Sequence, residues 1–286
     1  MERYADLHLH TTASDGTNTP KEVVSLAKGA GLSVISVTDH DSVDGIAEAA
    51  EAAKAFGLVF IPGVEFTSLY DGDGGKFRLH ILGYGIDPAS ESILNVIEEG
   101  RRIRRKKHSL RLDYLRRVHN ISFSDAELSM LPSDGTVGKL HIARLLMKRS
   151  MADSVGDAIK KYMSAPDFPE GCLPHRFVID GIKRSGGIPI YAHPFVDYSE
   201  DYLSFAEISG RIRRLSDDGM MGVECYHSSQ SSGEAAFLHL TTMRAGLLIS
   251  GGSDFHGENK TVKIGELMER RQIMAERLTV LSELVE

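Results

Sequence analysis

Short apolar runs rich in β-branched residues alternate along the chain with amphipathic segments of helical period. Seven runs of this kind predict strands, at residues 4–10, 32–38, 58–66, 77–85, 187–192, 222–226 and 247–250. Helix signals stand between them: Thr19, Pro20 and Glu22 form an N-terminal capping pattern, and Gly57 ends the Ala/Glu-rich segment 43–56. Strands that alternate with helices predict an α/β fold, either a parallel α/β barrel or a doubly wound sheet.

A long stretch in the middle of the chain breaks this alternation. Residues 88–175 contain no convincing strand but include helical patterns at 93–118, 138–149 and 154–163. We interpret this stretch as an α-helical insertion that caps the barrel domain, which would then consist of residues 1–87 and 176–261. The last segment, 262–286, is expected to form a C-terminal helical tail.

The composition is that of an ordinary globular protein and narrows the cellular setting. Of the 286 residues, 42% are hydrophobic and 26% are charged, which excludes collagen-like and wholly disordered chains. The longest apolar runs are far shorter than the roughly 18 residues of a membrane span, and the N-terminus has no apolar signal-peptide core. Two cysteines, Cys172 and Cys225, are too few for a disulfide framework. We therefore expect a cytoplasmic protein without membrane contact.

Charge is unevenly distributed along the chain. The net charge is −7, but residues 101–117 hold nine Lys/Arg against one Asp, a local charge of +8 that leaves −15 for the rest. At helical spacing, one flank of this segment carries basic side chains, namely Arg101, Arg105, His108 and Arg111. An apolar stripe accompanies them: Ile103, Leu110, Tyr114 and Val118. A solvated helix surface is the favoured interpretation, whereas a flank that faced a substrate site would attract polyanions such as RNA.

Side chains that can bind metal ions gather at the predicted strand ends. Six histidines, two aspartates and one glutamate lie on or just after a strand: His8, His10, Asp15, His40, Glu65, His80, His193, Asp254 and His256. In a parallel barrel the strand ends open onto one face, so these side chains are expected to converge. Each motif alone has a simpler interpretation, such as Asp39 as the N-cap of the helix at 43, but the coincidence at nearly every strand end favours a shared site.

The residue types indicate the chemistry of this site. His8 and His10 are two residues apart, so they point to the same side of a strand and can hold one ion between them. Imidazole and carboxylate donors without cysteine suit Mn, Zn or Fe in a reactive site better than a structural zinc. Nine donors fit two or three divalent ions, with Glu65 as the natural bridge. Because such a cluster activates hydroxide and neutralises a phosphate in the transition state, hydrolysis of phosphate esters is the expected reaction.

An ordered set of motifs carries a family resemblance over residues 6–257. The motifs are DLHLHTTASDG, VTDHD, GVEF, FRLHILGYG, YAHP and SGGSDFHG. Together they resemble the PHP (polymerase and histidinol phosphatase) family of metal-dependent phosphoesterases. The resemblance implies a distorted seven-stranded (β/α)7 TIM-like barrel with a metal cluster, commonly trinuclear. It implies one ion on His8, His10, Glu65 and Asp254, a second on Glu65, His80 and His193, and a third on Asp15, His40 and His256.

The helical insertion resembles the branch of this family that acts on nucleotides. Members of that branch remove the 3′-phosphate of nucleoside 3′,5′-bisphosphates or trim the 5′ ends of short RNA. The segments KLHIAR and VECYHSS resemble its substrate-contacting motifs, so His141, Arg144 and His227 are substrate-binding candidates. His141 and Arg144 share a helix face, and Arg144 would grip a second phosphate. Asp254, His193 and His227 are the catalytic candidates, and His227 would bind phosphate or protonate the leaving oxygen.

Two other functions remain open from the sequence alone. The first keeps the barrel and changes the substrate to histidinol phosphate or another small phosphomonoester. The second is a metal-binding regulatory module without turnover, against which the complete donor set argues. The expected partners are a small phosphorylated nucleotide and short RNA ends, and both a monomer and a small homo-oligomer are compatible with the sequence.

Overall fold

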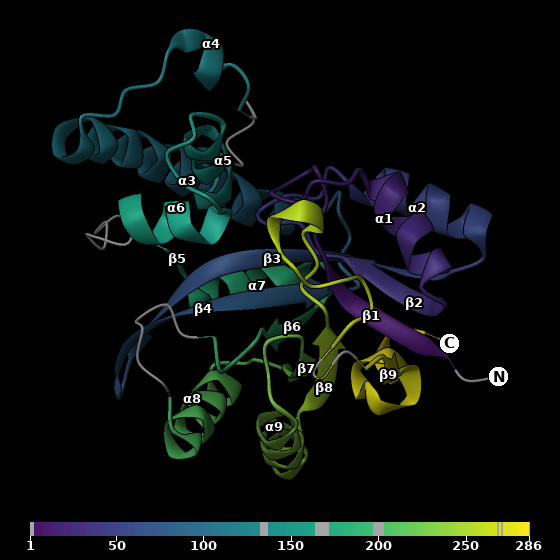
Figure 1. The fold of residues 1–286 in the computed structure, drawn as a ribbon. Coiled ribbons are helices and arrows are strands. Elements are labelled where there is room, and N and C mark those ends of the chain that lie inside the picture. Colours follow the sequence, from purple (N-terminus) through teal and green to yellow (C-terminus); the bar gives the residue numbers. More distant parts are fainter. Residues whose placement is uncertain are drawn as a thin grey trace.

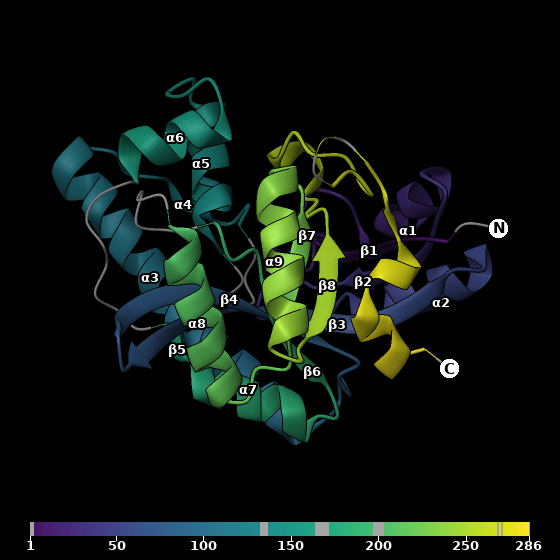
Figure 2. The ribbon, with the colours of Figure 1, turned by 90° about the horizontal axis from the view of Figure 1, so that it is seen from below.

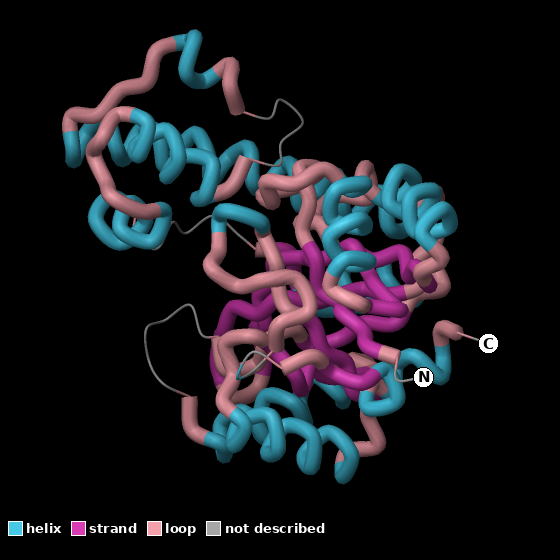
Figure 3. Tube along the Cα trace, turned by 45° about the vertical axis from the view of Figure 1, so that its right-hand side comes forward, coloured by secondary structure: helices cyan, strands magenta, loops and turns pink. Residues whose placement is uncertain are grey.

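A curved β-sheet surrounded by helices forms the body of the protein, and a group of helices projects from one side (Figures 1 and 3). The computed structural model describes residues 3–131, 137–163, 172–196, 203–267, 269 and 271–285.

The described part of the chain contains the seven strands expected from the sequence and two further strands of two residues each. In chain order they are β1 Tyr4–Leu9, β2 Leu32–Val37, β3 Val59–Gly72, β4 Gly75–Tyr84, β5 Leu173–Pro174, β6 Ile188–Tyr191, β7 Gly222–His227, β8 Leu248–Gly252 and β9 Ile273–Met274. Their order across the sheet is β8-β7-β6-β4-β3-β2-β1-β9, with β5 beside β3.

The sheet closes between its first and last long strands. The backbone N–H of Asp254 donates to the carbonyl of His8 at 2.9 Å, and the N–H of His10 donates to the carbonyl of Phe255 at 3.0 Å. The seven long strands therefore form a nearly closed barrel, and the alternative of a doubly wound open sheet is wrong. Closure brings the first and last motifs of the sequence side by side.

Strand β4 runs antiparallel to both of its neighbours, so the expectation of an all-parallel barrel is wrong at this strand. The connection is the cause. Only Asp73 and Gly74 separate β3 from β4, and so short a connection can join only antiparallel strands. Gly74 has a φ of +87°, which suits such a turn. His80 consequently lies in the middle of β4, paired with Thr67 of β3, and not at a carboxyl end.

Helices cover the barrel on several sides, as Figures 1 and 2 show. They are α1 Pro20–Gly29, α2 Ile46–Phe56, α7 His175–Arg184, α8 Phe205–Asp217 and α9 Ser232–Arg244. The expected capping box of α1 is present, because Thr19 Oγ1 accepts from the Glu22 N–H at 3.2 Å and the Glu22 carboxylate accepts from the Thr19 N–H at 2.8 Å. Helix α2 starts after Gly45 without a side-chain cap, so Asp39 does not cap it. Of the helices in the described ranges, none combines the length and apolar content that crossing a bilayer requires.

Between β4 and β5 the described chain forms the projecting helices (Figure 1). These are α3 Glu91–His119, α4 Asp125–Leu128, α5 Lys139–Lys148 and α6 Val155–Tyr162. The first turns of α3 bury Ile93 and Val96 in the main core of the barrel. Further along, Leu115 packs with Ile142 and other apolar residues of α5 and α6 in a separate small core. Helix α3 thus joins barrel and insertion, and it carries the basic segment 101–117.

The C-terminal segment differs from the expected helical tail. Its strand β9 pairs antiparallel with Tyr4 and Ala5 of β1, and two 3₁₀ turns follow, η3 Ala275–Arg277 and η4 Thr279–Glu283. Leu278 and Val280 are buried in the main core. A strand forms here because the outer edge of β1 has unpaired backbone groups that β9 satisfies and a helix would not.

Candidate metal centre at the barrel mouth

Glu65 of β3 lies in the middle of a ring of histidines contributed by other elements. Its Oε1 is 2.8 Å from His80 Nδ1 and 3.1 Å from His193 Nε2. Its Oε2 is 3.3, 3.2 and 3.2 Å from one ring nitrogen each of His8, His10 and His40. One carboxylate thus faces five imidazoles, which is the geometry of a bridging ligand.

The facing atoms of this ring are buried without hydrogen-bond partners in the described structure. They are His8 Nε2, His10 Nε2, His40 Nδ1 and Glu65 Oε2. An unsatisfied buried polar atom costs about 1–3 kcal/mol, so four together indicate a missing partner. Several groups of His, Asp and Glu here have ligand atoms within 4.8 Å of one another. The site therefore fits divalent metal ions held by nitrogen and carboxylate oxygen.

A second group of donors lies on the other side of His10. It comprises His10, Asp15, His40 and His256, all within ligand distance of one another. His256 Nε2 is 3.2 Å from Asp15 Oδ1, and the rings of His10 and His256 stack with centroids 4.0 Å apart. His256 Nδ1 lies 2.9 Å from the Asp254 carbonyl, which can only accept, so Nδ1 carries the proton and Nε2 has the lone pair.

Asp39 holds the loop that carries Asp15. Its carboxylate accepts from the N–H and hydroxyl of Thr11 at 2.8 and 2.7 Å and from the hydroxyl of Ser14 at 2.5 Å. Asp39 is buried and contributes no atom to the donor groups of the described residues. Asp39 therefore positions the loop. Its place in the sequence, next to the metal-binding candidate His40, gave no indication of this role.

Asp254 offers its two carboxylate oxygens to two different sets of partners. Oδ1 is 3.6, 3.4 and 3.3 Å from nitrogens of His8, His10 and His256. Oδ2 is 3.3 Å from His227 Nε2 and 2.5 Å from Lys260 Nζ. Asp254 has a φ of +57° and His193 a φ of +29°. Such strained backbone in non-glycine residues concentrates at functional sites.

Glu224 of β7 is a residue that the sequence analysis missed. Its side chain is fully buried, with Oε1 2.9 Å from His8 Nδ1 and Oε2 accepting from the N–H of His193 at 2.8 Å. The first contact orients the His8 ring so that Nε2 points at the cluster, and the second holds His193 in its strained conformation. A charged residue inside the otherwise apolar run GVECY was the available signal.

The carboxylates of the cluster are ionised despite their burial. Burial raises the pKa of Glu65, but His40, His80 and His8 lower it more, to well below its ordinary range. The pKa values of Asp15 and Asp254 follow the same pattern, lowered well below the ordinary range by neighbouring imidazoles and, for Asp254, chiefly by Lys260. These anions make the mouth of the barrel a strong cation site.

The histidines divide into two classes. Burial lowers the pKa values of His40, His80 and His256, which therefore stay neutral ligands. Burial also acts to lower the pKa of His10, but the carboxylates of Asp254 and Glu65 beside its Nε2 raise it to about 9. The pKa of His8 is raised well above its ordinary value, because Glu224, Glu65 and Asp254 outweigh burial. Without a metal, protons on His8 and His10 offset the carboxylate charge.

We expect the metal-free protein to lose stability as the pH rises from 6.5 to 9. The folded-state pKa of His10 lies above its unfolded value, so the bound proton stabilises the fold below pH 6.5 and is lost as the pH passes about 9. His40, His80 and His256 have lowered pKa values and are already neutral over this window.

Thermal unfolding of the chelator-treated protein at several pH values measures this loss, and His10→Gln should reduce it, leaving the part that the raised pKa of His8 contributes. Added Mn²⁺ should reverse the trend, since metal binding releases protons. A metal-free protein that grows more stable towards pH 9 would contradict the assignment.

Part of the basic segment on α3 faces the metal centre, so the solvated-helix interpretation is wrong for that part. Arg104 pairs with Asp41, its side chain is only 15% exposed, and its Nη2 is buried without a partner among the described residues. Burial and the guanidinium groups of Arg104 and Arg78 lower the pKa of Arg111 to about 10. His108 Nδ1 is also buried without a described partner. Arg104 and Arg111 thus form a crowded cationic cluster, and Arg104 lies beside Asp15 of the metal centre.

The basic flank and the apolar stripe expected from helical spacing were each misplaced at one position. Arg105 is directed outward and pairs with Glu98 at 2.6 Å, both side chains being largely exposed. Val118 is 59% exposed, whereas Leu115 is fully buried in the core of the insertion. Arg101 does lie on the inner side, where it donates to the Asp41 carbonyl and the Asp44 carboxylate.

The N-terminus of helix α5 lies beside Arg104 and Asp15. A Cβ atom on Gly138 would lie 3.7 Å from Arg104 Nη1 and 3.9 Å from Asp15 Oδ2. His141 accepts from the Gly138 N–H at 3.0 Å through Nδ1, so it stands in the first turn beside the cationic cluster. Arg144 is half-buried one turn further along and forms no ion pair with a described residue. The sequence analysis named Arg144 and did not single out Arg104, which lies beside Asp15 of the metal centre.

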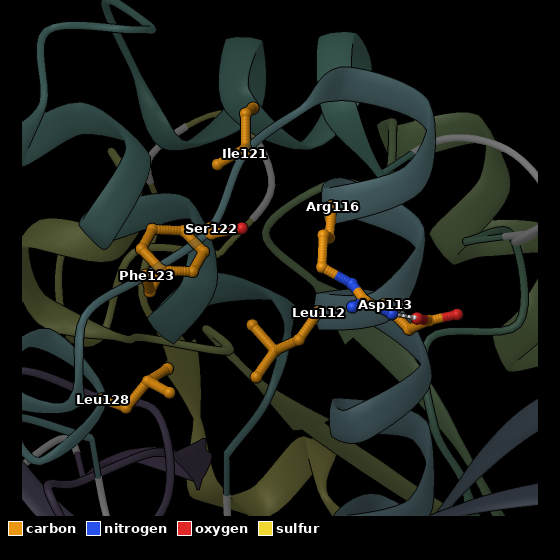
Figure 4. Close-up of a pocket in the computed structure, with 7 residues that line it drawn as sticks. All are labelled: Leu112, Asp113, Arg116, Ile121, Ser122, Phe123 and Leu128. Atoms are coloured by element: carbon orange, nitrogen blue, oxygen red, sulfur yellow. Dashed lines mark hydrogen bonds and ion pairs between the residues drawn. The ribbon is translucent and has the colours of Figure 1, made fainter.

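A separate cleft of about 270 Å³ lies in the insertion, between α3 and the segment that leads into α4 (Figure 4). It is lined by Leu112, Asp113, Arg116, Ile121, Ser122, Phe123 and Leu128. Its one arginine is paired with Asp113 at 2.6 Å. None of the predicted site residues lines this cleft, which is mostly apolar and no part of the metal centre.

The closed barrel and its buried donor cluster define a metal-dependent enzyme of the α/β-barrel class. A family model described as the PHP domain matches residues 6–166, more than half of the chain. The chain therefore belongs to the PHP domain family, which confirms the resemblance carried by its motifs.

Relatives and solved structures agree with this assignment. The chain is 28% identical over 279 residues to a 5′-3′ exoribonuclease of Haemophilus influenzae, covering 94% of this chain and 96% of that one. It is 30% identical over 259 residues to a 3′,5′-nucleoside bisphosphate phosphatase of Chromobacterium violaceum, covering 88% and 86%. A solved structure of a proposed metal-dependent phosphoesterase from Bifidobacterium adolescentis superposes with a TM-score of 0.84 at 27% identity, covering 99% and 96%. The expectation of a metal-dependent phosphoesterase is confirmed.

Proposed function

We infer that the enzyme removes the 3′-phosphate from nucleoside 3′,5′-bisphosphates and acts on the 5′ ends of short RNA. One observation carries this choice of substrate: Arg104, only 15% exposed, lies beside Asp15 of the metal centre, since a Cβ atom on Gly138 would be 3.7 Å from Arg104 Nη1 and 3.9 Å from Asp15 Oδ2. A simple phosphomonoester needs the metal centre alone. A second phosphate on the same molecule needs a second, adjacent cationic site.

The metal centre would receive the phosphate that is cleaved. We assign His8, His10, Glu65 and Asp254 to one ion, Glu65, His80 and His193 to a second, and Asp15, His40 and His256 to a third. Bound divalent ions would lower the pKa of water and neutralise the charge on the phosphoryl group. Glu224 and Asp39 hold the ligands in place from behind.

We propose that His227 of β7 contacts the substrate beside Asp254. The Ser229 N–H donates to His227 Nδ1 at 3.1 Å, so Nδ1 is an acceptor and the neutral ring carries its proton on Nε2. That N–H points at the outer oxygen of Asp254, 3.3 Å away. In this tautomer His227 is a hydrogen-bond donor to a phosphoryl or leaving oxygen.

The second phosphate would bind between α3 and the start of α5. Arg104 supplies a guanidinium nitrogen that has no partner among the described residues, and the first turn of α5 adds backbone N–H groups beside Gly138. We propose that residues 88–175 act as a cap domain on the barrel of residues 1–87 and 176–261, since the cap supplies both. His141 belongs to this subsite, and Arg144 would reach only the outer part of a longer RNA substrate.

Arg104→Lys should lower kcat/KM for adenosine 3′,5′-bisphosphate about 10- to 100-fold, and much less for adenosine 3′-monophosphate. The variant keeps the charge opposite Asp41 but loses the second guanidinium nitrogen, and one charge-assisted hydrogen bond contributes about 1.5–3 kcal/mol. Phosphate release with Mn²⁺, with a chelator as a blank, measures both substrates.

Arg105→Lys is the matched control, because Arg105 lies on the exposed side of the same helix. Equal losses on both substrates would show that Arg104 only supports the fold. If histidinol phosphate were hydrolysed faster than any nucleotide by the unaltered enzyme, the nucleotide assignment itself would be wrong.

A further inference from the structure

Lys260 is a charged residue at the metal centre to which neither the motifs nor the proposed reaction gives a role. It lies six residues after Asp254, at the end of the 3₁₀ turn η1 Gly257–Asn259. Its ammonium is 2.5 Å from Asp254 Oδ2, and its side chain is 39% exposed. It therefore approaches the cluster from the solvent side, the side from which a substrate enters.

The turn before Lys260 is anchored to the loop that carries Asp15. The Glu258 N–H donates to Thr17 Oγ1 at 2.9 Å, and Asn259 Nδ2 donates to the Asp15 carbonyl at 2.5 Å. Gly257 has a φ of +63°, and a Cβ there would lie 2.0 Å from Thr17 Oγ1. The position of Lys260 is thus built into the fold by close packing of two loops.

The two oxygens of Asp254 indicate what Lys260 faces. Oδ1 points at the ring nitrogens assigned to metal binding, whereas Oδ2 receives both Lys260 and His227. Lys260 brings a full positive charge and three N–H donors, of which only the one to Asp254 has an acceptor among the described residues.

Lys260 differs in burial and hydrogen bonding from Glu224, a residue that only positions a metal-binding candidate. Glu224 orients His8 from a fully buried position, and both of its oxygens are engaged. Lys260 is partly exposed, has spare donors and lies beside a second donor, His227, on the open side of the cluster. The spare N–H donors of Lys260, next to the N–H of His227, match the several terminal oxygens of a tetrahedral phosphate.

We propose that Lys260 binds the phosphoryl group at the metal centre, donating to a terminal oxygen of the phosphate that His227 also contacts. This inference rests on one part of the proposed function, namely that a phosphate binds at the metal centre. It does not depend on which nucleotide carries that phosphate. Lys260 exchanges its contact with Asp254 Oδ2 for one with the entering phosphate, while Asp254 Oδ1 keeps its place among the histidines.

Binding of inorganic phosphate to the Mn²⁺-loaded protein, measured by calorimetry, tests the proposal without turnover. Lys260→Met should weaken phosphate binding about tenfold or more, since a charge-assisted hydrogen bond is lost. Lys260→Arg should restore part of the affinity, and KM for the bisphosphate should rise in parallel. A Mn²⁺ titration without phosphate should show unchanged stoichiometry in all variants.

Lys263→Met is the matched control, because Lys263 is 80% exposed and lies three residues further along the same segment. Phosphate affinity within twofold of the unaltered protein in Lys260→Met would overturn the proposal, as would a loss of bound Mn²⁺ in that variant. Should Lys260→Met not fold, Lys260→Gln gives the same comparison with a polar side chain. If no nucleotide is hydrolysed while Lys260→Met still weakens phosphate binding, the nucleotide assignment fails and the role of Lys260 stands.

Discussion

Glu65→Gln should lower kcat/KM more than about 100-fold and reduce the number of bound Mn²⁺ ions. Loss of a residue that only supports a metal ligand lowers metal affinity or activity roughly 10- to 100-fold. Glu65 faces the metal site directly, so its loss should cost more. Its two oxygens face five imidazoles, and its Oε2 has no other partner among the described residues. The amide keeps the size of the side chain but removes the charge that would bridge two ions.

Mn²⁺ stoichiometry by calorimetry and steady-state kinetics measure this effect. Glu51→Gln is the matched control, because Glu51 is exposed on α2 and the chemical change is the same. Folding is checked by circular dichroism, since the variant also changes the partners of His80 and His193. Full metal loading with near-normal turnover in Glu65→Gln would remove the bridging role.

Glu224→Gln should lower kcat/KM about 10- to 100-fold and also destabilise the protein by about 1–3 kcal/mol. Glu224 accepts from the His8 ring and the His193 backbone, both fully inside the barrel. An amide can accept on one side only, so its NH₂ group would face a donor and leave the His8 ring free to turn. The loss should appear in metal affinity and in the unfolding temperature together.

Denaturant unfolding and Mn²⁺ affinity, measured on the same preparations, separate the two consequences. The Glu51→Gln variant serves here as well, as an exposed carboxylate with the same substitution. A destabilised Glu224→Gln protein that binds Mn²⁺ with unchanged affinity would show that Glu224 supports the barrel and not the ligands.

The sequence was most informative where local patterns act alone. All seven long strands and the three main helices of the insertion lie where their periodicity predicted them. The capping box at Thr19 and the left-handed end of α2 at Gly57 also follow from short-range chemistry. The nine donor positions could be selected because each stands out as polar at the end of an apolar run or within it.

Features that depend on contacts between distant segments could not be predicted from local patterns in the sequence. The antiparallel direction of β4 follows from the two-residue connection Asp73-Gly74. This signal was present in the sequence, but the alternation of strands and helices elsewhere favoured a parallel barrel. The C-terminal segment forms the strand β9 because the edge of β1 is free to pair with it, and no local pattern in the sequence reveals that edge. Arg104 and Arg105 are neighbours with the same chemistry, and only the packing of α3 on the barrel decides which one turns inward.

By itself the sequence determined the type of fold, the elements and the kind of donor atoms, because these follow from hydrophobic period, capping residues and side-chain chemistry. Only the tertiary structure decided which atoms face one another: that one glutamate meets five imidazoles, that Glu224 holds His8, and that Lys260 and His227 share an oxygen of Asp254. The physical reason is that coordination and charge pairing depend on distances of a few ångströms between residues separated by up to about 250 positions, and barrel closure sets those distances.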